Sequence, residues 1–484
     1  MPTAEHVMRH AAERPSRLAV CGPKARLTYA ELADRVQGAA RHLLGRGAGP
    51  GTLVAIGLRD PVALLTAALA ADLAGATPLV GDPSWSRARW SRLLTPETAD
   101  AETPAADVSA PPPATDTVLD VPAPFAAGLV VDVPLPYASG PPVWHEPKPQ
   151  DLAWACVTSG STGRPRAIVR SRASWTDSFE HLSELAGIGR DDVVLVPGPL
   201  VSSLYAFAAV HALATGATAL LPGRRPSTAQ AAGATVVHLV PHLLPDLLAR
   251  AGSLRAAVVG GAALGPGPRE QAARAGVRVM SYYGATELSF VAADIDGGGL
   301  RPFPGVEIEV RLPGAEERRA PLGEVWVRSP WLAEGYLGDA AGPLRRDGDG
   351  WVSVGDVAEP YRSGGALRVR GRGDGAIQTG GATVVPEDVE EVLRKVPGVA
   401  DVVVVGTPHP SLGAVVTAVV EAEQAAPPPR ALLEAAARDG LDAAQRPRRW
   451  HAVPSMPRTP AGKPARALIA ARLADGDPLI RRLA

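Results

Sequence analysis

Glycine and small hydroxyl residues crowd into one short segment, TSGSTGRPRAIV, from Thr158 to Val169. It lies between two strand-like runs, so its hydroxyl and backbone N–H groups could wrap a phosphate-bearing ligand. A Walker loop needs a lysine and then a helix after the last glycine, whereas here Gly163 leads into arginine, proline and a strand. Taken alone, the segment predicts either a phosphate-binding loop between two strands or a solvated polar turn.

Four further segments combine glycine with aromatic, hydroxyl or charged residues. In chain order they are YYGATE at Tyr282–Glu287, VGD at Val354–Asp356, GRGD at Gly371–Asp374 and PRTPAGKPAR at Pro457–Arg466. Taken singly, Tyr283 is typical of a core aromatic residue and Lys463 of a solvated surface lysine. A carboxylate such as Glu287 suits a hard cation, and one such as Asp356 can accept hydrogen bonds from two neighbouring hydroxyls.

The five motifs in this order resemble the adenylate-forming superfamily of acyl-CoA synthetases, luciferases and peptide-synthetase adenylation domains. The resemblance runs from about Leu27 to Arg466. It implies an enzyme that uses Mg-ATP to convert a carboxylic acid to an acyl-adenylate, with release of pyrophosphate, and then transfers the acyl group to a thiol. The expected class is an AMP-forming acid–thiol ligase that is similar to acyl-CoA synthetases.

The resemblance also implies an ATP site. Tyr283 would lie against the adenine ring, and Asp356 and Arg372 would bind the ribose and the adjoining phosphate. The loop around the triphosphate would consist of Thr158, Ser159, Gly160, Ser161, Thr162, Gly163 and Arg166.

Three residues carry the chemistry that the resemblance implies. Thr286 would hydrogen-bond the α-phosphate region, and Glu287 would be the ligand of Mg²⁺. Lys463 would stabilise the negative charge that develops as pyrophosphate leaves. Because the lysine is needed only for the first step, a small C-terminal domain would then rotate about Asp374 as a hinge.

Small residues are expected to line the acid pocket. They are Val201, Ser202 and Ser203, then Gly260, Gly261 and Ala262, and finally Gly284 and Ala285. Amino-acid-activating members place an aspartate near the first of these groups to pair with the substrate ammonium, and this chain has none there. A buried unpaired ammonium is costly, so the sequence predicts a non-amino acid, a fatty or other simple acid first and an aryl acid second.

The thiol that accepts the acyl group stays open between two candidates. Coenzyme A and the phosphopantetheine of an acyl or peptidyl carrier protein present the same arm, and Gly380 and Gly381 would leave room for it. A nucleotide-binding protein without turnover and an oxygenase of the luciferase type are further possibilities. Arg166 replaces the usual lysine of the family, and because arginine also binds phosphate we expect activity to be retained.

The elements that must position these residues follow from the hydrophobic pattern. From Asp151 to about Gly284, strand-like and helix-like runs alternate, which predicts a mostly parallel sheet covered by helices, with ligands beyond the carboxyl ends of its strands. From Gly305, short strands with no long helix predict an antiparallel sheet or small barrel. We expect an α/β fold with a large N-terminal domain, residues 1–373, and a small mobile α+β domain, residues 374–484.

Three segments near the N-terminus have weaker patterns. Leu27–Ala48 has helical spacing, and the apolar run Val62–Val80 predicts a packed helix rather than a membrane span because Asp72 and a glycine interrupt it. Ala101–Pro149 is rich in proline and alanine, and we interpret it as a loop-heavy connection.

The amino-acid composition limits the kinds of partner that we expect for this chain. The 484 residues include 49 basic and 50 acidic side chains, a net charge of −1, which gives no general attraction for nucleic acid or an anionic membrane. Two cysteines are too few for a disulfide framework, and the N-terminus lacks the apolar core of a secretory signal. The prediction is a cytoplasmic enzyme, monomer or homodimer, with no membrane insertion.

Overall fold

The chain divides into two units. The first takes in the described residues up to Val306 and from Ser329 to Gly342, and the second takes in Glu307–Arg328 and the residues from Pro343 onward. The computed structural model describes residues 3–83, 90, 93–94, 118–119, 125–159, 165–223, 232–250, 252–312, 322–338, 342–372, 375, 377–379, 382–409, 412–423, 426–441, 443–459 and 462–483.

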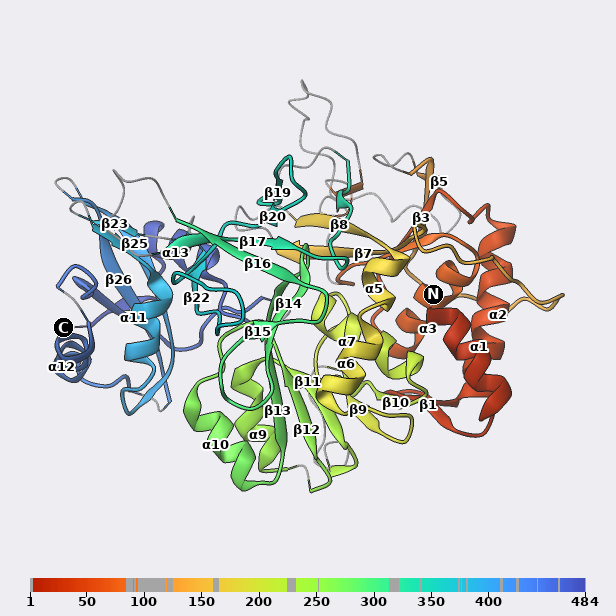
Figure 1. Ribbon diagram of the computed structural model, residues 1–484, viewed down its shortest axis with the longest axis horizontal. Coiled ribbons are helices and arrows are strands. Elements are labelled where there is room, and N and C mark those ends of the chain that lie inside the picture. The colour runs from red at the N-terminus through yellow and green to blue at the C-terminus, as the bar shows by residue number, and fades with distance from the viewer. Residues whose placement is uncertain are drawn as a thin grey trace. The chain divides into compact units, whose positions relative to one another are not determined.

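A nine-stranded sheet forms the larger part of the first unit (Figure 1). Its six middle strands are parallel neighbours, and antiparallel strands close both edges. In spatial order the strands are β15 (Arg301–Pro302), β14 (Ser289–Asp294), β13 (Arg278–Ala285), β12 (Ala256–Val259), β11 (Val236–Leu239), β9 (Val193–Leu195), β10 (Thr218–Leu220), β1 (Leu18–Cys21) and β2 (Arg26–Thr28).

Helices cover this sheet because its apolar side chains point to both faces. Val237 and Val259 pack with Leu244 and Ala272 of the helices α9 and α10 on one face. The helices α6 and α7 contact strands of the same sheet, as Figure 1 shows. Their bounds are α6 (Phe179–Ala186), α7 (Ser203–Ala214), α9 (Leu244–Leu248), which follows the 3₁₀ turn η1 (Pro241–Leu243), and α10 (Pro266–Arg274).

The second sheet of the first unit has seven strands in a mostly parallel core. Their spatial order is β18 (Gly335–Tyr336), β8 (Pro165–Ser171), β7 (Leu152–Ser159), β4 (Thr77–Val80), β3 (Thr52–Ile56), β6 (Ala127–Val131) and β5 (Val118–Leu119). The accompanying helices are α1 (Thr3–Glu13), α2 (Tyr29–Gly45), α3 (Pro61–Leu73) and α5 (Arg172–Thr176). Thr28 and Glu31 form a capping box at the start of α2, which fixes where that helix begins.

The second unit contains an antiparallel sheet in the order β19-β20-β17-β21-β22, with β16 beside β17. Its strands are short and no helix separates them, as the glycine-punctuated sequence predicts. They are β16 (Glu307–Arg311), β17 (Gly323–Arg328), β19 (Arg345–Arg346), β20 (Val352–Ser353), β21 (Asp356–Ala358) and β22 (Val369–Arg372).

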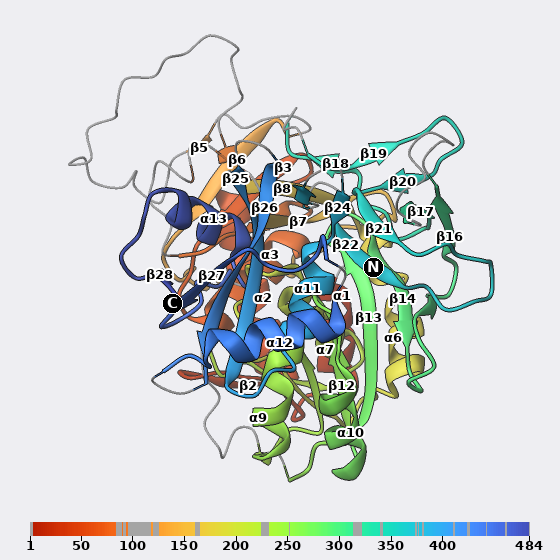
Figure 2. The ribbon, with the colours of Figure 1, turned by 90° about the vertical axis from the view of Figure 1, so that its left-hand side faces the viewer.

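The remaining sheet of the second unit is sandwiched by helices (Figure 2). Alternate residues of its long central strands pack with Leu393 and Leu433 on one face and with Ile469 on the other. The elements are β23 (Ile377–Thr379), β24 (Ala382–Val384), α11 (Pro386–Leu393), β25 (Val399–His409), β26 (Gly413–Ala422), α12 (Arg430–Gly440), β27 (Arg449–Val453), α13 (Arg466–Ala474) and β28 (Arg481–Arg482).

The predicted α/β fold class is confirmed, with two differences in detail. The loop-heavy interpretation of Ala101–Pro149 was wrong for Ala127–Val131, which is the strand β6 and pairs in parallel with β3. A short apolar run can be a fully buried strand, but the prolines around this run favoured the interpretation as a loop. The apolar run Val62–Val80 is a packed helix only to Leu73, after which Thr77–Val80 is a strand.

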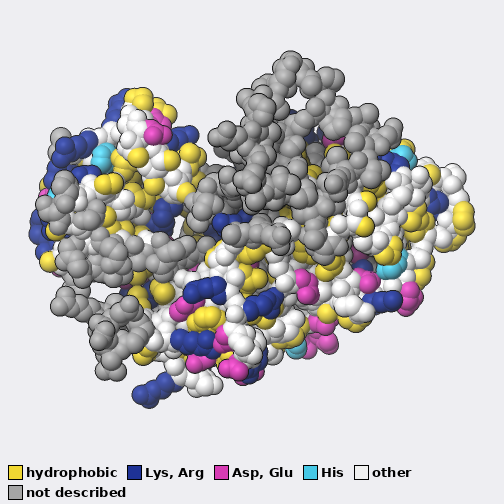
Figure 3. All heavy atoms as spheres, turned by 90° about the horizontal axis from the view of Figure 1, so that it is seen from above, with side chains coloured by type: hydrophobic (Ala, Val, Ile, Leu, Met, Phe, Trp, Pro, Cys, Tyr) yellow, Lys and Arg dark blue, Asp and Glu magenta, His cyan; other side chains and the backbone are white. Residues whose placement is uncertain are grey.

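Two findings bear on partners. None of the described helices combines the length and apolar character needed to cross a membrane. On the face that Figure 3 shows, acidic side chains lie among basic ones, as expected for a net charge of −1.

Candidate active site

The YYGATE motif comprises the end of β13, up to Ala285, and the first two residues of the hairpin turn to β14, Thr286 and Glu287. The Leu288 N–H donates to the Ala285 carbonyl across the turn at 3.1 Å, and Ser289 adopts a left-handed φ of 60°. A Cβ at Gly284 would lie 2.1 Å from the Ser289 carbonyl oxygen, so only glycine allows the two strands to approach this closely. The turn therefore presents Thr286 and Glu287 on a tightly constrained backbone.

The Glu287 carboxylate is buried, with 4% of the residue exposed. The Tyr336 hydroxyl donates to its Oε1 at 3.0 Å, and its backbone carbonyl accepts from the Ala333 N–H at 2.9 Å. A buried carboxylate with fixed orientation is an oxygen donor of the kind that Mg²⁺ prefers, so the residue fits the predicted ligand role. Tyr336 was not predicted, because nothing in the sequence sets it apart from the other tyrosines.

Thr286 joins the ATP motif to the segment predicted to line the acid pocket. Its Oγ1 lies 2.9 Å from the Ser203 Oγ, at the first residue of α7. Its backbone carbonyl accepts from Arg170 Nη1 at 2.6 Å. Arg170 was not predicted either, although a charge inside the apolar strand run AIVRS is a detectable signal.

The remaining predicted pocket residues follow the carboxyl ends of parallel strands. Val201 is buried and lies with Ser202 after β9, while Gly260, Gly261 and Ala262 follow β12. The two strands flank β11 in the sheet. A Cβ at Gly260 would lie 2.3 Å from the Tyr282 ring, so the space beside this glycine is taken by that ring.

The hydroxyl-rich loop is flanked by two strands, as predicted. The strands β7 and β8 are antiparallel, and Thr158 pairs with Arg166 next to the loop. Arg166 is half-buried. Four predicted residues, Gly160, Ser161, Thr162 and Gly163, lie outside the described residues, as do the side chains of Thr158 and Ser159.

The second unit holds the predicted ribose and lysine residues. Asp356 is buried, and its Cα pairs with that of Arg372, whose side chain lies outside the described residues, in the register of β21 and β22. Lys463 is exposed on a short loop in which the Thr459 N–H donates to the Lys463 carbonyl at 2.7 Å. Arg466, just after the loop, is paired with Glu387 at 2.7 Å and with Glu390, which anchors the loop to α11.

Three predicted residues of the second unit fall outside the described part of the chain. They are the hinge residue Asp374 and the glycines Gly380 and Gly381. The predicted domain boundary at residues 373 and 374 lies there too and stays a prediction.

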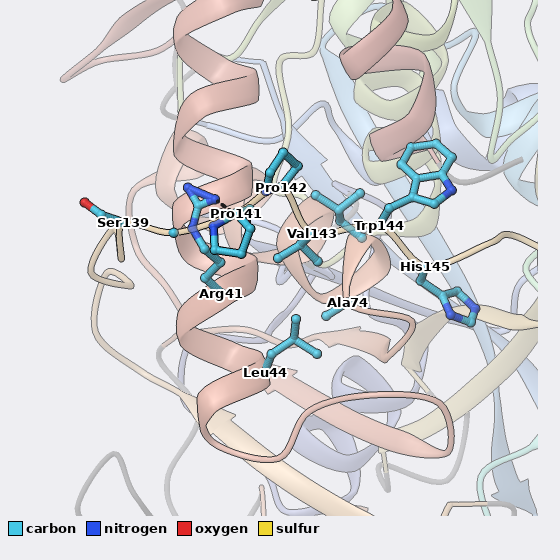
Figure 4. A pocket seen from close by; sticks show the side chains of 11 residues that line it. Arg41, Leu44, Ala74, Ser139, Pro141, Pro142, Val143, Trp144 and His145 are labelled. Carbon is cyan, nitrogen blue, oxygen red and sulfur yellow. Dashed lines mark hydrogen bonds between the residues drawn. The ribbon is translucent and has the colours of Figure 1, made fainter.

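A surface pocket lies elsewhere on the first unit (Figure 4). Arg41 and Leu44 of α2, Ala74, and the chain from Ser139 to His145 line it. None of the predicted site residues is among the residues that line it, so it has no place in the predicted chemistry.

The buried carboxylate on a glycine-dependent turn beside a helix-covered parallel sheet agrees with the resemblance to adenylate-forming enzymes. A family model described as AMP-binding enzyme matches residues 7–337, and one described as AMP-binding enzyme C-terminal domain matches residues 388–463. The chain belongs to the AMP-binding enzyme family.

Relatives and solved structures agree with this family. The chain is 29% identical to YhfT, an uncharacterized acyl-CoA ligase of Bacillus subtilis (strain 168), over 96% of this chain and 98% of that protein. It is also 29% identical to a feruloyl-CoA synthase of Amycolatopsis sp, over 85% of this chain and 87% of that protein. A structure of an E. coli MenE variant with bound OSB-AMS has a TM-score of 0.76 and 25% identity, and the match covers 97% and 98% of the two chains.

These comparisons confirm the predicted enzyme class, an AMP-forming acid–thiol ligase. The family uses ATP, and the relatives named here are ligases of coenzyme A. They do not favour a nucleotide-binding protein without turnover.

Proposed function

We propose that the chain activates a non-amino carboxylic acid with Mg-ATP and then transfers the acyl group to coenzyme A. The observation that carries this proposal is the 2.9 Å contact between Thr286 and Ser203. This contact joins the ATP motif to the start of α7, where the acid carboxylate would have to meet the α-phosphate. Adenylation depends chiefly on such positioning of two reactants, together with stabilisation of charge.

The first step would combine residues of several motifs. The Thr286 hydroxyl would donate a hydrogen bond to the α-phosphate region, and Asp356 and Arg372 would hold the ribose and phosphate. Glu287 would hold Mg²⁺, which would neutralise part of the triphosphate charge. Lys463 would approach the oxygens of the α-phosphate and of the attacking carboxylate as pyrophosphate leaves. Asp374 would be the hinge for the second step, in which Gly380 and Gly381 would line the path of the thiol.

The substrate we propose is a fatty or other simple carboxylic acid. Val201, Ser202 and Ser203 offer no carboxylate to an ammonium group, which disfavours an α-amino acid. An aryl acid is the second candidate, because one relative is named for feruloyl-CoA.

Acid-dependent exchange of pyrophosphate into ATP tests the first half of this proposal. Fatty, aryl and amino acids would be compared at equal concentration, and we expect exchange with one of the first two classes. Exchange with amino acids alone would overturn the assignment of the substrate. If none of the acids supports the exchange of pyrophosphate into ATP, the proposed adenylation itself is overturned.

A competition between thiols tests the second half. The acid that supports exchange would be incubated with ATP and either coenzyme A or a holo carrier protein, and the products would be identified by mass spectrometry. We expect acyl-CoA, because the named relatives are ligases of coenzyme A. Acylation of the carrier protein alone would make that protein the acceptor instead.

A further inference from the structure

Arg170 is a buried cation beneath the YYGATE turn. Only 4% of the residue is exposed, and burial lowers the pKa of its guanidinium to about 10, so it stays charged at neutral pH. Nη1 donates to the Thr286 carbonyl, and Nη2 donates to the Ser174 carbonyl at 2.9 Å and to the Trp331 carbonyl. One side chain therefore ties together α5, the turn after β13 and the segment that leads to β18.

These contacts hold the two backbone segments that orient Glu287. Thr286 precedes Glu287 directly, and Trp331 lies two residues before Ala333, whose N–H donates to the Glu287 carbonyl. A guanidinium has a planar set of donors in fixed directions, so it sets the spacing between the carbonyls it binds. Loss of the donors would leave buried carbonyl groups unpaired.

Ser203 holds Thr286 by its side chain. The Ser203 Oγ contacts the Thr286 side-chain hydroxyl, whereas Arg170 contacts the Thr286 backbone carbonyl. The two contacts come from different elements, α7 and β8. Together they restrict both the rotamer of Thr286 and the position of its backbone.

We propose that Arg170 and Ser203 are positioning residues that clamp Thr286, and with it Glu287, in the geometry required for adenylation. This inference rests on the function proposed above. Neither residue needs to touch ATP or the acid, because each acts through Thr286. Misplacement of a reacting group by about 1 Å can cost on the order of a hundredfold in rate, so a clamp of this kind has a measurable effect.

Hydrogen exchange of the ligand-free protein tests the clamp without any use of activity. We expect Ser203→Ala and Arg170→Lys to speed exchange of the peptide that spans residues 282–289 by about tenfold, and to leave a peptide over β11 unchanged. Thr215→Val is the matched control, because it removes a hydroxyl at the C-terminal end of α7 that donates to the Ala212 carbonyl at 2.9 Å, at the opposite end of that helix from Ser203. Unchanged exchange at residues 282–289 in both test variants would overturn the clamp.

Pyrophosphate exchange then tests its consequence. Ser203→Ala should lower kcat about tenfold, leave both KM values within about twofold, and have no further effect when Thr286 is already valine. A rise in KM for the acid alone would make Ser203 a direct contact of the substrate and overturn its positioning role. If Ser203→Ala lowers kcat by the same factor when Thr286 is already valine, the two residues act independently and the positioning role is also overturned. If the wild-type chain shows no pyrophosphate exchange, that result counts against the proposed function. The hydrogen-exchange experiment would still test whether Arg170 and Ser203 clamp Thr286.

Discussion

The Glu287 carboxylate shows how much a single residue depends on neighbours distant in sequence. The motif YYGATE predicted its chemistry, and the structure adds burial and the hydrogen bond from Tyr336. The motif could not indicate Tyr336, because a tyrosine forty-nine positions away in the chain has no local pattern that connects it to the turn. The motif therefore carries the prediction of a metal ligand, whereas the contacts that orient Glu287 depend on the fold.

Glu287→Gln isolates the charge of this residue. Glutamine keeps an oxygen that can accept from Tyr336, so we expect the turn to persist while the Mg²⁺ concentration for half-maximal exchange rises about tenfold or more. Titration of magnesium in the pyrophosphate exchange assay measures this half-maximal concentration. Glu334→Gln, at an exposed carboxylate of the segment that leads to β18, is the control. An unchanged magnesium requirement in Glu287→Gln would argue against the metal role.

A buried ion pair fixes α3 within the first unit. Asp72 Oδ1 lies 2.8 Å from Arg172 Nη1, and the two side chains are 4% and 2% exposed. In the sequence, Asp72 is only an interruption of an apolar run, and the position of its partner a hundred residues later follows from the fold. The helix was predictable, but the reason for its acidic residue was not.

Asp72→Asn should destabilise the protein by about 3 kcal/mol, because it removes the nearer and more deeply buried of the two carboxylates that pair with Arg172 and leaves Asp151 at 3.6 Å. Urea unfolding measures this change. Asp246→Asn removes an exposed carboxylate 3.9 Å from Arg250 and should cost less than about 0.5 kcal/mol. Equal effects of the two substitutions would contradict the assigned importance of burial.

Two buried histidines connect α7 with β11. His211 and His238 have ring centroids 6.3 Å apart, and burial lowers the pKa of His211 to about 4 and that of His238 to about 3. The folded state thus binds fewer protons than the unfolded state once the pH falls below about 6.5. The stability that these neutral rings contribute is complete above that pH and declines toward pH 4.

The slope that each histidine contributes should rise from about 0.7 kcal/mol per pH unit at pH 6.5 toward about 1.4 kcal/mol per pH unit near pH 5.5. His238→Met removes one titrating group and replaces a ring whose Nε2 has no hydrogen-bond partner. Urea unfolding at pH 6.5 and 5.5 should therefore show a smaller loss of stability in the variant, by about 1 kcal/mol. The same loss in both proteins would show that His238 titrates normally.

The predicted site residues are divided between the two units of the chain. Thr286 and Glu287 belong to the first unit, whereas Asp356 and Lys463 belong to the second. The order of motifs along the chain predicted the large fold and the small C-terminal α+β part. The short strands from Gly305 onward predicted the antiparallel sheet, whereas the pairing of β17 with β21, which lies far along the chain, depends on the fold.

Lys463→Ala should separate the two half-reactions. We expect adenylate formation to fall at least about a hundredfold because a charge at the leaving pyrophosphate is lost, while transfer from supplied acyl-adenylate to the thiol persists. Single-turnover assays of each step measure the difference. Lys395→Ala, at an exposed lysine paired with Glu391, is the control. Equal loss of both steps would contradict the assignment of Lys463 to the first step alone.

The most direct test of the central claim is a product balance for one complete turnover. The chain, Mg-ATP, coenzyme A and the acid that supports exchange would be incubated, and all products would be quantified by mass spectrometry. The account predicts AMP and acyl-CoA in equal amounts, together with pyrophosphate. Formation of ADP and phosphate, or of AMP without any acyl-CoA, would contradict it.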